Sequence, residues 1–430
     1  MSTVPSFVQR TPAMKTIMRA GAVNGLRAEL QLLGVQRVLL VCSGSVRRSS
    51  LHPLLLQQLQ GLQLLQAPDI PAHSSAELVE RLAAQGAQQS TQCIVAVGGG
   101  SSSDTAKAIA LLMAEGGSLA DHASRFTPPD QLHIPVLARP KVPIVSIPCT
   151  ASGAEVTPSL GIRDADGRKL LFTDPQLASR VVLLDPQANL EVPASLMLST
   201  GMNGIAHCVE GLYSKERSPL AEVLALDALR RFAQALPDVH AKPNDLAARA
   251  QLLYAAHLSG LVLVNARTAL HHAVCHAIGS VTGAPHGQAN AVLLPHALRF
   301  NRPAVHDALR RASAVVPGGQ DVIAWIESLG GTLGVPQRLR DIGVSRESLG
   351  AIAQKTMGER GLYFNPRQVL DASEWRAGEE IVLASTDYNP RQAEASNMAL
   401  LGHVDLQARS AYHPEIKQQG NRWIAYVGHH

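Results

Sequence analysis

Val95-Ala-Val-Gly98-Gly99-Gly100-Ser101-Ser102-Ser103-Asp104-Thr-Ala-Lys107 is the stretch of this sequence that decides the fold. Apolar residues of a buried strand come first, three glycines follow, and the alanine-rich run beyond Asp104 continues as a helix. Glycine lets backbone amides approach a diphosphate, and the N-terminus of the following helix offers unpaired N–H groups and the positive end of its dipole. The stretch therefore predicts either a diphosphate site or a tight turn that needs glycine for its backbone geometry alone.

A second turn of the same kind favours the diphosphate site. The stretch Ile147-Pro-Cys149-Thr150-Ala-Ser152-Gly153 also follows a strand-like run. Two such turns at strand ends suit a dinucleotide that lies across the edge of a parallel sheet. We therefore predict that the first half of the chain binds a dinucleotide.

The segments around these two turns indicate the fold class. Between residues 37 and 185 the β-rich runs RVLLVC, CIVAV, PIVSIP and RVVLLDP alternate with helical stretches, as in a doubly wound parallel sheet. From residue 186 onward, long alanine- and leucine-rich segments replace this pattern. In one of them Ser218 fits the N-cap, Pro219 fits the first helical position and Pro237 is expected to end the helix.

The expected fold is an α/β N-terminal dinucleotide-binding domain with a parallel sheet, followed by an all-α helical domain. We place the first domain at residues 1–185, the helical catalytic domain at 186–385 and a C-terminal extension of unknown role at 386–430. The extension is polar and rich in turn-forming residues, and its alternating run RWIAYV, residues 422–427, predicts one strand.

Composition excludes several classes of protein. Of the 430 residues, 46% are hydrophobic and 17% are charged, as in a well-buried globular enzyme. The net charge of +4 is spread thinly, so we expect no nucleic-acid partner. We also expect no signal peptide and no membrane helix, which needs roughly 18 uninterrupted apolar residues. Five cysteines without a CxxC pair indicate reduced thiols, as in a cytoplasmic protein.

The end of the first strand bears on the choice of dinucleotide. It reads Val41-Cys42-Ser43-Gly44, without the acidic residue that normally holds the adenosine ribose and excludes a 2′-phosphate. Arg47 and Arg48 follow, and each is either a solvated surface arginine or a phosphate contact. We therefore expect NADPH to be used alongside NADH.

Histidines gather on three short segments in the second half of the chain. Asn203 and His207 lie four residues apart on one predicted helix, His272 and His276 lie four residues apart on another, and His286 follows a proline. Residues at this spacing share one helix face. Three such imidazoles could hold a divalent metal with His276 left as a proton donor. A lone histidine in an apolar helix is usually a core residue, but the clustering favours a functional site.

The ordered motifs of the chain resemble those of the iron-containing alcohol dehydrogenase superfamily. They are VGGGSSSDTAKAIA, IPCTASGAEVTP, VVLLDP, TGMNGIAH, LHHAVCH and PHGQANAVLLPH, and the resemblance spans roughly residues 18 to 384. The chain is most similar to the maleylacetate reductase branch, whose members reduce a carbon–carbon double bond in a dicarboxylate from aromatic-ring degradation. Asn203, where the metal-dependent alcohol dehydrogenases have aspartate, the double histidine in LHHAVCH and the short PCTASGAEVT turn support that branch.

The resemblance also implies which residues form the site. Those implied to bind the cofactor are Ser43, Gly98, Gly99, Gly100, Ser101, Asp104, Cys149, Thr150 and Lys169, with Lys169 at the nicotinamide ribose. The metal positions of the superfamily fall on Asn203, His207, His272 and His286, a site that is either empty or holds iron or zinc. His272 and His276 are implied as catalytic histidines. The chain departs from the pattern at Cys149, where threonine is usual, and in the sequence GQAN after His286.

We therefore expect an NAD(P)H-dependent reductase that transfers a hydride to an unsaturated or oxo carboxylic acid, such as maleylacetate to 3-oxoadipate. His272 or His276 would protonate the product, and Arg267 would bind a substrate carboxylate. The alternatives are an iron- or zinc-dependent alcohol or aldehyde dehydrogenase, a dehydroquinate-synthase-like lyase, and a dinucleotide binder without catalysis. We expect a small anionic substrate and a homodimer.

Overall fold

The computed structural model describes residues 6–71, 74–128, 130–369, 412–419 and 422–428. The chain divides into a large unit, Met1–Asp387, and a C-terminal unit, Tyr388–His430. In the C-terminal unit the strands β11 (Tyr412–Gln419) and β12 (Arg422–Gly428) pair antiparallel, so the strand predicted from RWIAYV is confirmed. The predicted boundary between residues 385 and 386 lies outside the described residues.

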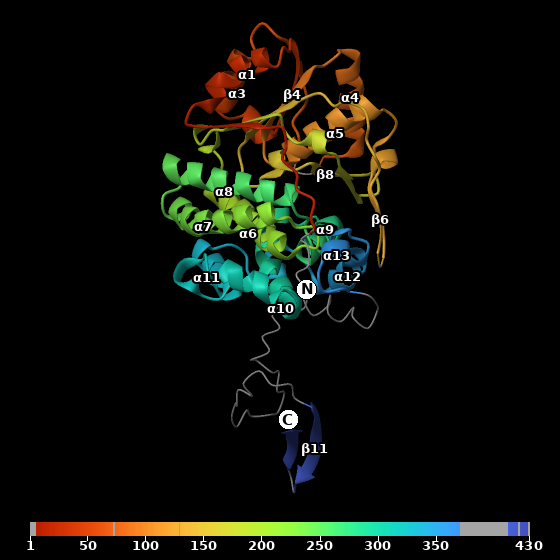
Figure 1. Ribbon diagram of the computed structural model, residues 1–430, viewed down its shortest axis with the longest axis vertical. Helices are drawn as coiled ribbons and strands as arrows, with labels where there is room; N and C mark the ends of the chain where they lie inside the picture. Colours follow the sequence, from red (N-terminus) through yellow and green to blue (C-terminus); the bar gives the residue numbers. More distant parts are fainter. Residues whose placement is uncertain (1–5, 72–73, 129, 370–411, 420–421, 429–430) are drawn as a thin grey trace. The chain divides into compact units, whose positions relative to one another are not determined.

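A six-stranded parallel sheet organises the first half of the large unit (Figure 1). In spatial order its strands are β1 (Lys15–Met18), β10 (Val181–Leu184), β7 (Ile144–Pro148), β4 (Cys93–Gly98), β2 (Arg37–Cys42) and β3 (Gln63–Gln66). The four interior strands are those that the β-rich runs predict. The sequence pattern missed the two edge strands, because each has only four residues and leaves much of its surface exposed.

Alternate residues of the interior strands reach opposite faces of the sheet. In β2, Leu39 and Val41 pack in one core with the helices of one face, and Val38 and Leu40 pack in a second core with those of the other. The helices of the two faces are α4 (Ala76–Gln88) with α5 (Gly100–Glu115), and α1 (Leu26–Leu32) with α3 (Leu51–Gln58) (Figure 1). Because both faces are covered, the strands read as continuous apolar runs.

The second half of the large unit is helical. Its helices are α6 (Ala194–Tyr213), α7 (Pro219–Ala241), α8 (Leu246–Val264), α9 (Leu270–Thr282), α10 (His286–Ser313), α11 (Val322–Leu333), α12 (Leu349–Met357) and α13 (Gly361–Phe364). By length and composition alone, the helix α8 could cross a membrane, because its most apolar stretch has a mean hydropathy of 1.3. However, 61% of that stretch is buried inside the protein. It packs in the main helical core with α6 and α7. The predicted fold class, a parallel α/β sheet followed by a helical region, is confirmed.

One predicted helix end is wrong. Pro237 lies inside α7, which continues to Ala241. Proline removes one backbone hydrogen bond of a helix, but Leu236 and Val239 on either side of it are buried in the helical core. Packing therefore carries the helix one turn past the proline. Ser218 and Pro219 start the helix as predicted, with the Ser218 hydroxyl accepting from the Ala221 amide.

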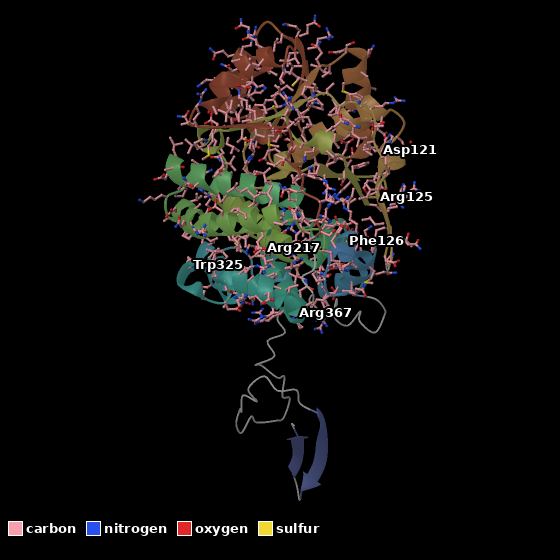
Figure 2. All side chains as sticks on the ribbon, viewed as in Figure 1. Asp121, Arg125, Phe126, Arg217, Trp325 and Arg367 are labelled. Atoms are coloured by element: carbon pink, nitrogen blue, oxygen red, sulfur yellow. The ribbon has the colours of Figure 1, made fainter. Side chains whose placement is uncertain are left out.

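Two small hairpins connect the sheet to the helices. The hairpin of β5 (Arg125–Thr127) and β6 (Gln131–His133) carries Phe126, which Figure 2 labels. The ring centroid of Phe126 lies 6.4 Å from that of Tyr363. The hairpin of β8 (Ser159–Arg163) and β9 (Lys169–Thr173) pairs Arg163 with Lys169. The second hairpin carries basic side chains to the helical half.

The two halves of the large unit meet backbone to backbone at a pair of glycines. A Cβ atom on Gly153 would lie 2.4 Å from the Ala256 carbonyl oxygen, and one on Gly260 would lie 2.4 Å from the Gly153 carbonyl oxygen. Gly153 also has φ 64°, which glycine adopts without strain. Both positions therefore require glycine for this close approach of the turn after β7 to α8.

Candidate active site

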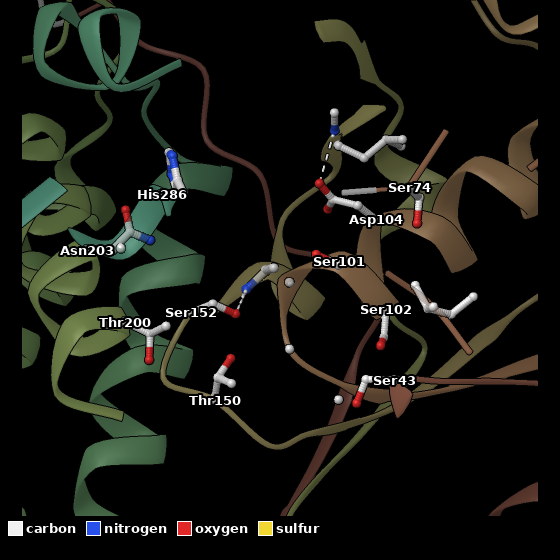
Figure 3. Close-up of a pocket in the computed structure, with 18 of the residues that line it drawn as sticks. Ser43, Ser74, Ser101, Ser102, Asp104, Thr150, Ser152, Thr200, Asn203 and His286 are labelled. Atoms are coloured by element: carbon white, nitrogen blue, oxygen red, sulfur yellow. Dashed lines mark hydrogen bonds between the residues drawn. The ribbon is translucent and has the colours of Figure 1, made fainter. Parts of the chain in front are cut away.

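A cavity of about 920 Å³ is lined by both halves of the large unit, within the usual size range of small-molecule sites. It is lined by the carboxyl ends of β2, β4 and β7, by the β8–β9 hairpin, and by α6, α9 and the start of α10. All the residues that the resemblance implies for cofactor, metal or catalysis lie on its wall: Ser43, Gly98, Gly99, Gly100, Ser101, Asp104, Cys149, Thr150, Lys169, Asn203, His207, His272, His276 and His286. Figure 3 shows Asn203 and His286 facing the Ser101 and Asp104 side of the cavity.

The glycine turn brings backbone to the cavity wall. Gly98 has φ 138°, and a Cβ atom there would lie 2.6 Å from the Ser102 hydroxyl oxygen. A Cβ atom on Gly99 would lie 3.2 Å from the Thr150 side chain. Gly99 is the N-cap of the 16-residue helix α5, so the first amides of that helix face the cavity end of the turn. This is the geometry that a diphosphate needs.

The second turn contributes hydroxyl groups rather than a second long helix. It is followed by a short 3-10 helix, Ala154–Val156, and then by β8. The buried hydroxyl oxygens of Thr150 and Ser102 form no hydrogen bond with any described residue. Buried polar atoms are normally satisfied, so these two hydroxyls on the cavity wall fit a polar ligand. A nicotinamide dinucleotide therefore suits the residues present.

Asp104 and Lys169 bring opposite charges to the cavity wall, and each shifts the pKa of the other. The Asp104 carboxylate accepts from the Gly161 amide at 3.1 Å (Figure 3), which holds the β8–β9 hairpin against α5. Burial raises the pKa of Asp104, and Lys107 and Lys169 oppose that shift. Burial also lowers the pKa of Lys169, whose ammonium group donates no hydrogen bond to a described residue. Lys169 is thus a cation on the cavity wall that is available to a ligand.

Asn203 joins two histidines through its side-chain amide. Its Oδ1 lies 3.1 Å from Nε2 of His272, and its Nδ2 lies 3.2 Å from Nε2 of His207. This series of hydrogen bonds continues from Nδ1 of His207 to the Ser259 hydroxyl at 3.4 Å. That hydroxyl donates to the Ala256 carbonyl at 2.7 Å. An amide can bridge two imidazoles because it carries both a donor and an acceptor, whereas a carboxylate only accepts.

Glu210 ends this buried series of hydrogen bonds on the His272 side. Its Oε2 lies 2.5 Å from Nδ1 of His272, and its Oε1 accepts from the His271 amide at 2.9 Å. Glu210 therefore fixes the orientation of the His272 ring, with Nδ1 toward Glu210 and Nε2 toward Asn203. Burial raises the pKa of Glu210 and lowers that of His272. Sequence reasoning missed Glu210, although it lies three residues after His207 on the same helix.

His276 has a separate carboxylate partner. Its Nδ1 lies 3.4 Å from Oε2 of Glu359, and its ring stacks on that of His286 with centroids 5.5 Å apart. Burial lowers the pKa of His276, and Lys169 lowers it further, while Glu359 raises it. Glu359 therefore favours the protonated form of the one histidine that the sequence leaves outside the metal positions.

The four superfamily metal positions are close together, and three of them, Asn203, His207 and His272, already bond to one another. The fourth, His286, is in ring contact with His272 and His276. A transition metal bound here would take Nε2 of His207 and His272, which the Asn203 amide engages in this structure. The ligand set would contain an amide in place of a carboxylate, and it would bring no negative charge to the ion. A second, buried group of ligand atoms within 4.8 Å of one another, Glu210, His271 and His272, shares His272 with the first. The residues do not fit a metal well, because Asn203, His207 and His272 satisfy one another without one.

Basic residues surround the histidine end of the cavity. Arg163 and Arg360 line it together with Lys169. Arg163 donates to the Gly279 carbonyl at 2.7 Å, and Arg360 donates to the Thr173 hydroxyl at 3.1 Å. Burial lowers the pKa of Arg360 to about 10, so it remains cationic at neutral pH. Arg267, which sequence reasoning assigned to a substrate carboxylate, is not among the residues of the cavity wall.

Charged residues also lie at the other end of the cavity, beyond β2. Arg47 and Arg48 form ion pairs with Asp69, from the Arg47 Nε to Oδ1 at 3.0 Å and from Arg48 to Oδ2 at 3.6 Å. Arg48 and Asp69 line the cavity and Arg47 does not. No sequence pattern pointed to Asp69, to Glu359 or to Arg360, because each follows an element that the motifs do not include.

Known relatives are similar in sequence to most of this chain. The chain is 30% identical over 363 residues to a maleylacetate reductase of Rhizobium sp. (strain MTP-10005), covering 84% of this chain and 94% of that protein. It is 31% identical over 368 residues to a maleylacetate reductase of Sphingobium indicum, covering 85% of this chain and 94% of that protein. The match therefore extends through both halves of the large unit.

Solved structures share the fold. The crystal structure of maleylacetate reductase from Rhizobium sp. strain MTP-10005 superposes with a TM-score of 0.74 at 29% identity, covering 89% of this chain and 99% of that one. A crystal structure of 1,3-propanediol oxidoreductase superposes with a TM-score of 0.81 at 27% identity, covering 89% of this chain and all of that one.

Two family models match the two halves of the large unit. Residues 13–186 match the model described as iron-containing alcohol dehydrogenase, and residues 197–373 match the C-terminal model of the Fe-containing alcohol dehydrogenase family. Family members are oxidoreductases that use a nicotinamide cofactor, in agreement with the cavity described above. The chain belongs to the iron-containing alcohol dehydrogenase family, on its maleylacetate reductase branch.

Proposed function

We propose that this chain is an NAD(P)H-dependent reductase of an unsaturated oxo-dicarboxylate such as maleylacetate, which it converts to 3-oxoadipate. The observation that carries the proposal is the set of three cations, Lys169, Arg163 and Arg360, on the same cavity wall as His272 and His276. The dinucleotide, when bound, supplies the hydride, and the rest of the chemistry falls to the residues of the cavity.

The cations select the substrate. A guanidinium group binds a carboxylate through two parallel hydrogen bonds, and a buried site strengthens each charge-assisted contact. Arg163 and Arg360 each bond a backbone or hydroxyl oxygen through one terminal nitrogen, which fixes the direction of the side chain. A simple alcohol or aldehyde would leave these charges unpaired, so the site favours an anionic substrate over a neutral one.

His276 is positioned to supply the proton. Reduction of a carbon–carbon double bond adds a hydride to one carbon and a proton to its neighbour, so a proton donor must reach the second carbon. Glu359 favours the protonated form of His276, while His272 is held between Glu210 and Asn203. We therefore assign proton donation to His276 and substrate orientation to His272.

A metal-dependent alcohol or aldehyde dehydrogenase of the same family is the second candidate, and the four side chains at the superfamily metal positions are what favours it. A dehydroquinate-synthase-like lyase would use the cofactor only transiently. Net oxidation of NADH with substrate excludes the lyase, and a chelator separates the two oxidoreductases.

The experiment is a substrate panel on the full-length chain. Maleylacetate, 2-enoic and 2-oxo dicarboxylates, and neutral alcohols and aldehydes are each tested with NADH and with NADPH, with and without chelator. We expect the dicarboxylates to be turned over best and chelation to have no effect. Preferential turnover of neutral alcohols that chelation abolishes would reject the proposal. A homodimer in the cytoplasm remains our expectation, which light scattering and cell fractionation would check.

A further inference from the structure

Asp69 lies beside the end of β2, although it belongs to the segment after β3. The Ile70 amide donates to the Cys42 carbonyl at 3.1 Å, and Ile70 forms an isolated parallel bridge with Ser43. The backbone around Asp69 is thus fixed to the strand end where a dinucleotide fold normally places its acidic ribose ligand. Asp69 also lines the cofactor cavity.

The Asp69 carboxylate is held in place by a neighbouring arginine. Arg47 lies 3.0 Å from Oδ1, donates to the Ala67 carbonyl, and reaches the Gln66 side chain at 3.3 Å. Arg47 is mostly covered, with its side chain 20% exposed. Three contacts therefore orient Arg47, and Arg47 in turn orients the carboxylate.

Gly44 leaves room for that carboxylate. A Cβ atom on Gly44 would lie 2.6 Å from Oδ2 of Asp69, so any larger residue there would displace the carboxylate. The Arg48 guanidinium lies 3.6 Å from Oδ2, and its side chain is 74% exposed. That contact is weak, because an exposed ion pair at this distance contributes little. The oxygen Oδ2 is therefore the one available to a ligand.

We propose that Asp69 recognises the adenosine ribose of the cofactor and makes this chain prefer NADH to NADPH. This inference rests on the dinucleotide-binding part of the proposed function. A carboxylate accepts hydrogen bonds from the ribose hydroxyls of NADH. A 2′-phosphate replaces one of those donors with negative charge, which the carboxylate repels. The acidic residue missing from the first strand is thus supplied by the segment after the neighbouring strand.

A second acid on the cavity wall, Glu191, is engaged elsewhere. Its Oε1 accepts from the Ser50 amide at 2.9 Å, and hydrogen bonds from the Ser50 hydroxyl and amide lower the pKa of Glu191. Glu191 follows β10, which the strands β7 and β4 separate from β2. Asp69, and not Glu191, therefore has the oxygen and the position that the ribose requires.

The test measures binding of dinucleotides and of their adenosine halves to the full-length protein without substrate. The variants are Asp69→Asn, Glu191→Gln and, as a matched exposed control, Asp307→Asn on α10, whose side chain is 78% exposed. The probes are NADH, NADPH, ADP-ribose and 2′-phospho-ADP-ribose, titrated calorimetrically, with a thermal melt of each variant. Wild type is expected to bind NADH at least tenfold more tightly than NADPH.

Asp69→Asn is expected to lower the affinity for NADH and ADP-ribose about tenfold. The affinity for the 2′-phosphorylated probes is expected to stay unchanged or to rise. Arg47→Gln is expected to produce part of the same loss, because it releases the carboxylate. Equal affinity of wild type for both dinucleotides, an equal loss for both in Asp69→Asn, or a loss confined to Glu191→Gln would overturn the inference. Because no substrate is present, a wrong substrate assignment leaves this result intact, whereas a wild type that binds neither dinucleotide rejects both proposals.

Discussion

Nδ2 of Asn203 lies 3.2 Å from Nε2 of His207, one helical turn along α6. The amide hydrogen thus points at a nitrogen lone pair that a metal would otherwise take. Replacing Asn203 with aspartate removes that donor and adds a negative charge between His207 and His272. The arrangement then favours a cation at the centre of the three side chains.

Asn203→Asp is therefore expected to raise the affinity for Zn²⁺ or Fe²⁺ measurably, at least tenfold, since close charge attraction is the largest new contribution. The wild type is expected to hold metal weakly or not at all, and chelation is expected to leave its reductase activity intact. Metal content by mass spectrometry and zinc titration check both statements. Stoichiometric metal in wild-type protein purified without added metal, with chelator-sensitive activity, would assign this chain to the metal-dependent dehydrogenases.

Gly99→Val is expected to abolish dinucleotide binding and to leave the fold largely intact. Its branched side chain would fill the space where phosphate meets backbone and would approach Thr150, which lies 3.2 Å from the Cβ position. The matched control is Gly350→Val in the exposed part of α12, where a Cβ atom has no neighbour within 4 Å. Dinucleotide titration beside a thermal melt decides the matter, and unchanged affinity in Gly99→Val would make the glycine turn purely structural.

Arg360→Gln and Arg163→Gln are expected to raise KM for the dicarboxylate substrate more than they lower kcat. A hydrogen bond to a charged group contributes about 1.5–3 kcal/mol, so kcat/KM should fall roughly 10- to 150-fold in each variant. Arg230→Gln on α7, whose side chain is 53% exposed, is the control. If neutral substrates lose as much as dicarboxylates do, these arginines hold the structure rather than the substrate.

Glu359→Gln is expected to move the pH profile of kcat to lower pH. The pKa of His276 lies below its usual value because burial and Lys169 lower it, and Glu359 raises it against them. Loss of the carboxylate charge removes the opposing effect, so the protonated histidine is lost at a lower pH and activity falls earlier as pH rises. Steady-state rates between pH 5 and 8 test this. A profile that stays in place or moves upward would exclude His276 as the proton donor.

Most of the fold follows from local sequence patterns. The four interior strands and the start of α7 were predictable, because apolar runs and a serine–proline start depend only on neighbouring residues. The end of α7 was not predictable in this way. Pro237 breaks a local rule, and the burial of Leu236 and Val239 against other helices decides the outcome.

Site residues that lie within one short motif were predictable from the sequence. Site residues that come from two distant segments were not. The glycine turn and the histidines share short motifs, and all of them line one cavity. Asp69 reaches the end of β2 only through the parallel pairing of β2 with β3, and Glu359 reaches His276 from 83 residues away. Partners of this kind depend on strand order and helix packing, which the spacing of residues along the chain does not record.

The facing glycines at positions 153 and 260 also set a rule for recombining this chain with its relatives. A chimera that joins the α/β half of one protein to the helical half of another inherits each glycine from a different parent. With a side chain at either position, the halves must separate, since a Cβ atom would lie 2.4 Å from a carbonyl oxygen of the opposite half. The cavity between the halves would widen with them. Functional hybrids should therefore come from parents that carry both glycines, or from exchanges that transfer the pair together.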